Sequence, residues 1–121
     1  MRAADYGAMQ MTTTTETKTI DWSGKSGKTY RYWIHPLPPN FKAAAGNYIF
    51  AKETSPGNGK WLPIYIGETG DLSERFDDHH KMGCIKRNGA THIHAHTNDN
   101  ERARLDEEAD LIANWNPPCN D

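Results

Sequence analysis

Two stretches of sequence decide the fold: Asn47-Tyr48-Ile49-Phe50-Ala51-Lys52 and Leu62-Pro63-Ile64-Tyr65-Ile66-Gly67. Both are rich in the β-branched and aromatic residues that favour strands. The residues between them, 54–59, read Thr-Ser-Pro-Gly-Asn-Gly and have the composition of a turn or loop. The pattern therefore predicts an antiparallel hairpin.

The alternation of side chains along the two strands predicts which of them meet. Tyr48 and Phe50 share one face of the first strand. In the second strand we expect Ile64 and Ile66 to share a face and Tyr65 to take the opposite one. In the simplest register Tyr48 and Tyr65 then lie together on neighbouring strands.

A further hairpin is expected upstream, over residues 20–37. Its turn, 23–28, is rich in Gly and Ser and separates two aromatic segments. Gly24 and Gly27 do not form a phosphate-binding loop, because that loop needs four residues between its glycines and a helix after them. The turn is therefore interpreted as a simple connection between strands.

Two helices and one short strand are expected downstream. Asp71 begins a predicted helix over 71–82, since Asp71-Leu72-Ser73-Glu74 matches a capping box. Residues 90–97 alternate in the manner of a strand. The last helix is expected over 99–115, with Asn98 as its N-cap.

The last predicted helix carries an apolar stripe with helical spacing, formed by Leu105, Ala109, Ile112 and Trp115. Glu108 falls on this stripe, whereas Glu107 is rotated by about 100° toward solvent. A carboxylate on a buried stripe is costly unless it is paired or holds a metal ion. Glu108 is thus expected to form a salt bridge, to lie at the wet edge of the stripe, or to bind a metal ion.

The two strands also carry a family resemblance. Gly46-Asn47-Tyr48 and Tyr65-Ile66-Gly67 resemble the paired tripeptides of the GIY-YIG nucleases. Arg75 lies ten residues after Tyr65, where the family places its helix arginine, and His79 follows four residues later. Asn47 departs from the apolar middle residue of the first tripeptide, and we expect it to point away from Tyr48.

The end of the chain extends the resemblance. Glu108-Ala109-Asp110-Leu111-Ile112, followed by Pro117 and Asn120, is similar to the closing pattern of the family, which begins with a metal-binding Glu. The resemblance covers residues 46–120. It implies an α+β fold in which a three-stranded antiparallel sheet is flanked by helices. Residues 20–40 would then be an added N-terminal hairpin.

The resemblance also implies an activity. GIY-YIG nucleases are metal-dependent endonucleases that cleave DNA by one attack of water, without a covalent enzyme intermediate. Glu108 would hold a single Mg²⁺ or Mn²⁺, because these hard ions prefer carboxylate and water ligands. Homing, restriction, DNA repair and single-strand cleavage all occur in the family, so the form of the DNA is left open.

The resemblance gives the other site residues their expected roles. Arg75 would clamp the scissile phosphate through its planar guanidinium. Tyr48 would orient the attacking water or accept its proton, and His79 would relay that proton. Tyr65 would hydrogen-bond the phosphate or the water. Asn120 would support Glu108 or the loop after the last helix.

The net charge of the chain does not by itself indicate a nucleic-acid partner. The formal net charge is -2 and the pI is about 6.3, so the basic surplus typical of nucleic-acid binders is absent. Glu68 adds an acidic group that repels phosphate or lies in solvent. A basic face is expected nevertheless, formed by Arg75, Lys81, Lys86 and Arg87. A non-catalytic nucleic-acid-binding module on the same fold is the alternative.

Three histidines line one face of the strand predicted over 90–97: His92, His94 and His96. Histidines at alternate strand positions can share a zinc ion, but no Cys/His pair has zinc-finger spacing. A solvated or DNA-facing polar face is the preferred interpretation.

Domain count and compartment follow from the remaining features. We expect a disordered tail over 1–19 and a single domain over 20–121. Cys84 and Cys119 form no CxxC motif, which suits free thiols in a reducing compartment. No apolar run approaches the roughly 20 residues of a membrane span, and the N-terminus has no signal-peptide stretch. The expected location is the cytoplasm.

Overall fold

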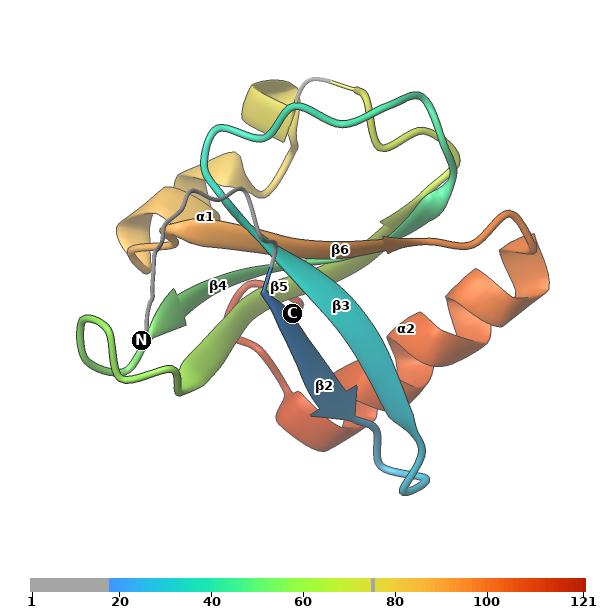
Figure 1. Cartoon of the computed structure of the whole chain (residues 1–121), viewed down its shortest axis with the longest axis horizontal. Coiled ribbons are helices and arrows are strands. Elements are labelled where there is room, and N and C mark those ends of the chain that lie inside the picture. Colours follow the sequence, from blue (N-terminus) through green and yellow to red (C-terminus); the bar gives the residue numbers. More distant parts are fainter. Residues whose placement is uncertain (1–17, 75) are drawn as a thin grey trace, which may run out of the picture.

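The computed structural model describes residues 18–74 and 76–121 (Figure 1). Its strands are β2 (Thr19–Ser23), β3 (Thr29–Pro36), β4 (Gly46–Glu53), β5 (Trp61–Thr69) and β6 (His92–Thr97). The helices are a short 3-10 helix, η1 (Phe76–Asp78), and the α-helices α1 (Met82–Arg87) and α2 (Glu101–Trp115). No helix in the described part of the chain is long and apolar enough to cross a membrane.

All five strands form one antiparallel sheet in the order β2-β3-β6-β4-β5, curled into a half-barrel. The expected three-stranded sheet with an added hairpin is therefore wrong. The β2–β3 hairpin continues the sheet, because β3 pairs with β6 through Trp33↔Ala95 and Ile34↔His94. That pairing satisfies backbone groups that β6 would otherwise leave open at an edge.

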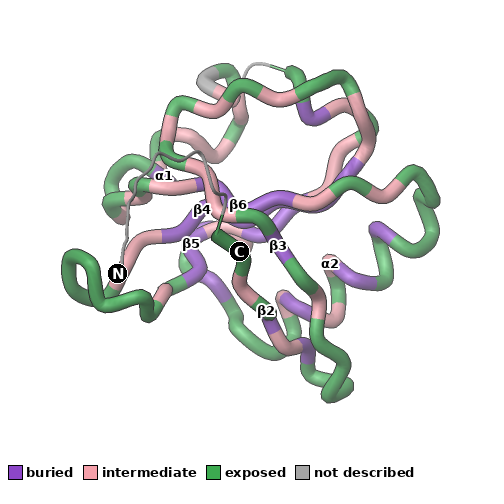
Figure 2. The backbone as a smooth tube through the Cα atoms, viewed as in Figure 1, coloured by how far each residue is buried: buried purple, intermediate pink, exposed green. Residues whose placement is uncertain are grey.

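The core lies on both faces of the sheet, and Figure 2 shows buried residues gathered along β4, β5 and β6. Tyr48 and Phe50 join one cluster, which includes Ile85 of α1. Ile49 joins the other, which includes Leu111 of α2. The alternation predicted for the first strand is confirmed, and each α-helix covers one face.

A β-bulge changes the alternation in β5. Phe50 pairs with Tyr65 and Ala51 pairs with Pro63, so Ile64 is the extra residue. As a result Ile64 packs in the cluster of Tyr48, on the side of Tyr65, whereas Ile66 joins the opposite cluster. The prediction that Ile64 and Ile66 share a face is wrong, because a bulge shifts the period by one residue.

The helix expected over 71–82 is also wrong. The side chain of Asp71 accepts the Ser73 N–H at 2.9 Å, and the Leu72 N–H donates to the carbonyl of Ala44 at 2.7 Å. These bonds hold a turn where a helical ladder was expected. Only η1 follows, and α1 begins at Met82.

Helix α2 exists as predicted but starts later and buries a different face. Asn100 is its N-cap and accepts the Ala103 N–H at 2.9 Å, in place of Asn98. Its buried residues are Arg104, Glu107 and Leu111, while Leu105 of the predicted stripe is 41% exposed. The stripe was misplaced because the sheet beneath the first half of α2 is polar.

Glu107 shows this polar contact most clearly. Its Oε2 atom accepts a hydrogen bond from the Tyr32 hydroxyl at 2.6 Å and lies 2.7 Å from Nε2 of His96. Burial lowers the pKa of His96, but the hydrogen bond and charge of Glu107 outweigh it, so the pKa is raised. Glu107 is thus the buried, paired carboxylate of α2, where the sequence suggested a solvent-facing one.

The two cysteines are joined. Cys84 of α1 and Cys119, in the turn after α2, form a disulfide with their Cα atoms 5.9 Å apart. The expectation of free thiols is wrong, and it failed because a sequence separation of 35 conceals their closeness in space. Disulfides persist mainly in oxidising compartments, so the cysteines no longer support a cytoplasmic location.

Candidate active site

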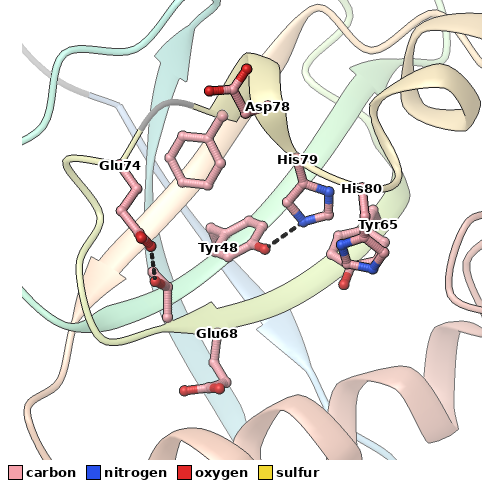
Figure 3. Close-up of a pocket in the computed structure, with 9 residues that line it drawn as sticks. Tyr48, Tyr65, Glu68, Glu74, Asp78, His79 and His80 are labelled. Carbon is pink, nitrogen blue, oxygen red and sulfur yellow. Dashed lines mark hydrogen bonds between the residues drawn. The ribbon is translucent and has the colours of Figure 1, made fainter.

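A cleft with a volume of about 690 Å³ lies on the β4–β5 face beside η1 (Figure 3). Its lining residues are Tyr48, Tyr65, Glu68, Thr69, Glu74, Phe76, Asp78, His79 and His80. The cleft therefore brings together three residues expected from the sequence, Tyr48, Tyr65 and His79. Glu74, Phe76 and Asp78 were not foreseen as lining residues, because the segment that carries them was expected to be helical.

The two tyrosines stack over a glycine. Their ring centroids lie 6.1 Å apart with an interplanar angle of 29°, as the predicted register requires. A Cβ atom on Gly67 would lie 2.6 Å from Cζ of Tyr48 and 2.9 Å from Cε2 of Tyr65. Any side chain at position 67 would thus displace the tyrosines, which gives the second tripeptide its need for glycine.

The first tripeptide needs glycine for a similar reason. A Cβ atom on Gly46 would collide with the carbonyl oxygen of His96 and lie 2.7 Å from Cδ1 of Leu72. Asn47 points to the opposite face from Tyr48, as expected. It is fully buried, and its Nδ2 donates to the Arg104 carbonyl at 3.0 Å, so this departure from the family pattern holds α2 against the sheet.

His79 approaches Tyr48 through a defined tautomer. Its Nε2 atom lies 2.8 Å from the Tyr48 hydroxyl oxygen (Figure 3). Its Nδ1 atom accepts the backbone N–H of Lys81 at 3.0 Å. Because Nδ1 is an acceptor, the proton of the neutral ring lies on Nε2 and is donated to Tyr48. His79 is therefore a donor to Tyr48 in this arrangement.

Burial keeps both partners neutral. It lowers the pKa of His79, with a further contribution from the neighbouring His80. It raises the pKa of Tyr48 well above the ordinary value, helped by Tyr65 and by the charge of Glu108. His80 was not singled out from the sequence, but its ring stacks on His79 with centroids 4.6 Å apart.

Glu108 is half-buried on α2. Burial raises the pKa of its carboxyl, and the negative charge of Glu68 raises it further. Glu108 does not line the cleft, although its charge contributes to the raised pKa of both Tyr48 and Tyr65. A carboxylate that is raised in pKa by burial and a like charge favours a cation beside it.

Glu68 has a partner that the sequence did not reveal. Its Oε1 accepts a hydrogen bond from Nε of Arg104 at 2.9 Å, and the Arg104 side chain is only 7% exposed. The negative charge of Glu68, which was expected to repel phosphate or to lie in solvent, is thus offset by the buried guanidinium of Arg104 on α2.

Asn120 supports the second tripeptide. Its Oδ1 accepts the Ile66 N–H at 2.8 Å, and its Nδ2 donates to the Ile66 carbonyl at 2.8 Å. These bonds fasten the outer edge of β5 directly beside Tyr65. Cys119 adds a third bond, from its N–H to the Ile64 carbonyl at 3.1 Å. The side chain of Asn120 therefore ties the segment after α2 to β5, which agrees with the second of its two expected roles, support of the loop after the last helix.

The structure describes three of the four residues expected to form a basic face. Arg75 lies outside the described residues. Lys81 is bound to the last residue, with Nζ 3.1 Å from the carbonyl oxygen of Asp121. Lys86 and Arg87 are exposed in the last turn of α1, and neither lines the cleft.

The three strand histidines share one face, but that face is not solvated. His94 is fully buried, and its Nδ1 accepts the Trp22 indole N–H at 3.0 Å. His92 and His94 both pack edge-on against Trp61. Burial, followed by the charges of His92 and His35, lowers the pKa of His94 to about 3. The interpretation as a DNA-facing surface is wrong, because α2 and the tryptophans cover these side chains.

The donor set suits a hard cation better than zinc. Within residues 18–74 and 76–121, no three His, Cys, Asp or Glu side chains gather into a group that could hold a metal ion. Mg²⁺ does not need such a group, because it usually binds one or two carboxylates and keeps several waters. Glu108, with Glu68 near it, fits that requirement.

Comparisons with models of protein families, with curated proteins and with solved structures gave no match. The resemblance to GIY-YIG nucleases accordingly rests on the residues quoted from the sequence.

Proposed function

We propose that this chain is a metal-dependent DNA endonuclease of the GIY-YIG type. The observation that carries the proposal is the pairing of the Tyr48 hydroxyl with His79 at 2.8 Å, beside Tyr65, in the cleft on the β4–β5 face. The resemblance assigns catalysis to these residues, and they come together from β4, β5 and the segment after η1.

Tyr48 orients the attacking water in this proposal. A hydroxyl has one hydrogen to donate and two lone pairs to accept with, and His79 uses one lone pair. The remaining hydrogen and lone pair are left for a water molecule or a phosphate oxygen in the cleft. Because the pKa of Tyr48 is raised, the neutral hydroxyl is a positioning group and not a base.

The other residues complete the reaction. Tyr65, half-buried in the cleft wall, donates its hydroxyl hydrogen to the phosphate or the water. The water oxygen forms a new bond to phosphorus and loses a proton to solvent, while the bond to the leaving oxygen breaks and that oxygen takes up a proton from solvent. Arg75 clamps the phosphate, an assignment that comes from its position in the sequence alone.

Glu108 holds the Mg²⁺ or Mn²⁺ ion, with Glu68 close enough for its charge to act on the same position. When bound, the ion supplies positive charge for the phosphate and for the leaving oxygen. Its charge would also offset that of Glu68, which acts on the Glu108 carboxyl.

A non-catalytic nucleic-acid-binding module is the second candidate. The position of Glu108 favours it, because this expected metal ligand does not line the cleft that holds Tyr48, Tyr65 and His79. This candidate predicts binding without cleavage whatever metal ion is added.

The Tyr48→Phe variant tests the proposal. It removes one hydroxyl and leaves the stacked rings and the fold, so nicking of DNA with Mg²⁺ should fall roughly 10²-fold or more. Tyr30→Phe is the matched control. The Tyr30 hydroxyl donates a hydrogen bond of 2.7 Å to Asp110, and neither residue lines the cleft. Equal nicking by wild type and Tyr48→Phe would contradict the assigned role.

A further inference from the structure

A single row of residues crosses the sheet through Tyr48. Trp33 of β3 pairs with Ala95 of β6, Ala95 pairs with Tyr48 of β4, and Tyr48 pairs with Gly67 of β5. Residues paired in this way direct their side chains to the same face. Two strand spacings of about 4.8 Å separate the backbones of Trp33 and Tyr48, so they lie roughly 10 Å apart.

A hollow lies beside Trp33 on this face of the sheet, and Tyr48 does not line it. The hollow has a volume of about 260 Å³, and Trp33, His35, Phe41, Leu72 and Ala95 contribute to its lining. It shares Phe41 and Leu72 with a depression beside loop residues 38–41, which in turn shares Glu74 and Phe76 with the catalytic cleft. The hollow, the depression and the cleft therefore lie next to one another in this order, with the shared residues as their common walls.

Trp33 is exposed without a structural reason in the described chain. It is 40% exposed, and its ring packs against no other aromatic ring among residues 18–74 and 76–121. Trp115 is similarly exposed, at 38%, but its indole N–H donates to the Ser23 carbonyl at 2.8 Å and its ring packs edge-on against Trp22. Trp115 thus has a role in the fold that Trp33 lacks.

We propose that Trp33 is a stacking platform for an unpaired nucleobase adjoining the phosphate that binds at Tyr48. Aromatic side chains of this kind bind bases of any sequence, because every base has a π face. The faces of a base inside a duplex are already covered by its neighbours, so the platform selects single-stranded DNA. This inference rests on the proposed function and names its substrate class.

The test measures affinity separately from cleavage. A dye-labelled thymidine oligonucleotide is titrated with protein in EDTA, and its fluorescence anisotropy is recorded for wild type, Trp33→Ala, Trp33→Phe and Trp33→Leu. Trp33→Ala and Trp33→Leu should weaken binding roughly 5- to 100-fold, and Trp33→Phe should retain most of it. Leu62→Ala, which truncates another exposed apolar residue, is the control and should bind as wild type does.

The outcomes distinguish this inference from the proposed function. Equal affinity for Trp33→Leu and wild type overturns the platform, as does an equal loss on a duplex of the same length. Loss confined to the single strand supports the platform even if no variant nicks DNA, a result that would overturn only the endonuclease. If wild type nicks DNA and Trp33→Leu shows unchanged KM and affinity, the endonuclease stands and the platform fails.

Discussion

Nε2 of His79 lies 2.8 Å from the hydroxyl oxygen of Tyr48, while Nδ1 of the same ring accepts the Lys81 N–H at 3.0 Å. The ring is thus oriented by the backbone that follows it and presents an N–H to Tyr48. A hydrogen-bond donor at position 79 needs only an N–H, whereas a proton relay needs a group that can also gain and lose a proton. Substitutions of His79 can therefore distinguish the two roles.

His79→Gln and His79→Leu give the first prediction. A glutamine side chain offers an N–H donor but cannot titrate, whereas leucine offers neither. We expect His79→Leu to lose roughly 10²-fold in nicking rate and His79→Gln to keep most of it, because one preorganised donor contributes an effect of this size. Equal loss in both variants, measured at neutral pH, would show that His79 relays a proton.

The glycine beneath the tyrosines gives the second prediction. Gly67→Ala places a methyl group 2.6 Å from Tyr48 and should destabilise the fold by about 1–3 kcal/mol while displacing both rings. Gly70→Ala is the control, since no atom lies within 4 Å of the added Cβ. Urea unfolding of the two variants checks the difference. A Gly67→Ala protein as stable as Gly70→Ala would refute the packing described here.

Asn120 gives the third prediction. Asn120→Ala removes both hydrogen bonds to the backbone of Ile66, at the part-buried edge of β5. We expect a loss of about 1–3 kcal/mol in the free energy of unfolding and faster amide hydrogen exchange at Ile66. Unchanged exchange at Ile66 would show that β5 does not depend on this side chain.

The disulfide gives the fourth prediction. It closes a loop with a sequence separation of 35, so its reduction should lower the free energy of unfolding by roughly 3–4 kcal/mol. Urea unfolding with and without a phosphine reductant measures the change, and a Cys84→Ala, Cys119→Ala double variant should be insensitive to the reductant. Two titratable thiols in the native, unreduced protein would contradict the pairing.

His94 gives the fifth prediction, on pH. Its pKa of about 3 lies below the unfolded value of about 6.5, so the unfolded chain binds more protons between these limits. The stability from this site is present above pH 6.5 and is lost as the pH falls toward 3, by at most about 1.4 kcal/mol per pH unit. The His94→Gln variant should lack this component of the slope. If the stability of the His94→Gln variant depended on pH as that of the wild type does, a contribution of His94 to the pH dependence would be excluded.

The sequence predicted the β4–β5 hairpin and the closeness of Tyr48 and Tyr65 on neighbouring strands, because alternation and turn composition are local properties. It did not predict the pairing of β3 with β6, which joins residues about sixty positions apart. Nor did it predict the bulge at Ile64, which depends on how β5 meets β4.

The face of α2 was misjudged for a comparable reason. The apolar residues of the helix suggested one stripe, but the sheet beneath offers Tyr32, His96 and Glu68. Arg104 and Glu107 are buried because these distant strands supply polar partners. A helix pattern read alone assumes an apolar partner surface, and here the partner surface is polar.

The most direct test of the central claim is nicking of single-stranded, duplex and branched DNA with Mg²⁺ or Mn²⁺ by wild type, Glu108→Gln and Glu101→Gln. Both variants remove one charge from α2, but only Glu108 lies near the tyrosines. We predict metal-dependent nicking by wild type and Glu101→Gln and none by Glu108→Gln. No nicking of any substrate by folded wild type with metal present, or equal nicking by Glu108→Gln, would contradict the account.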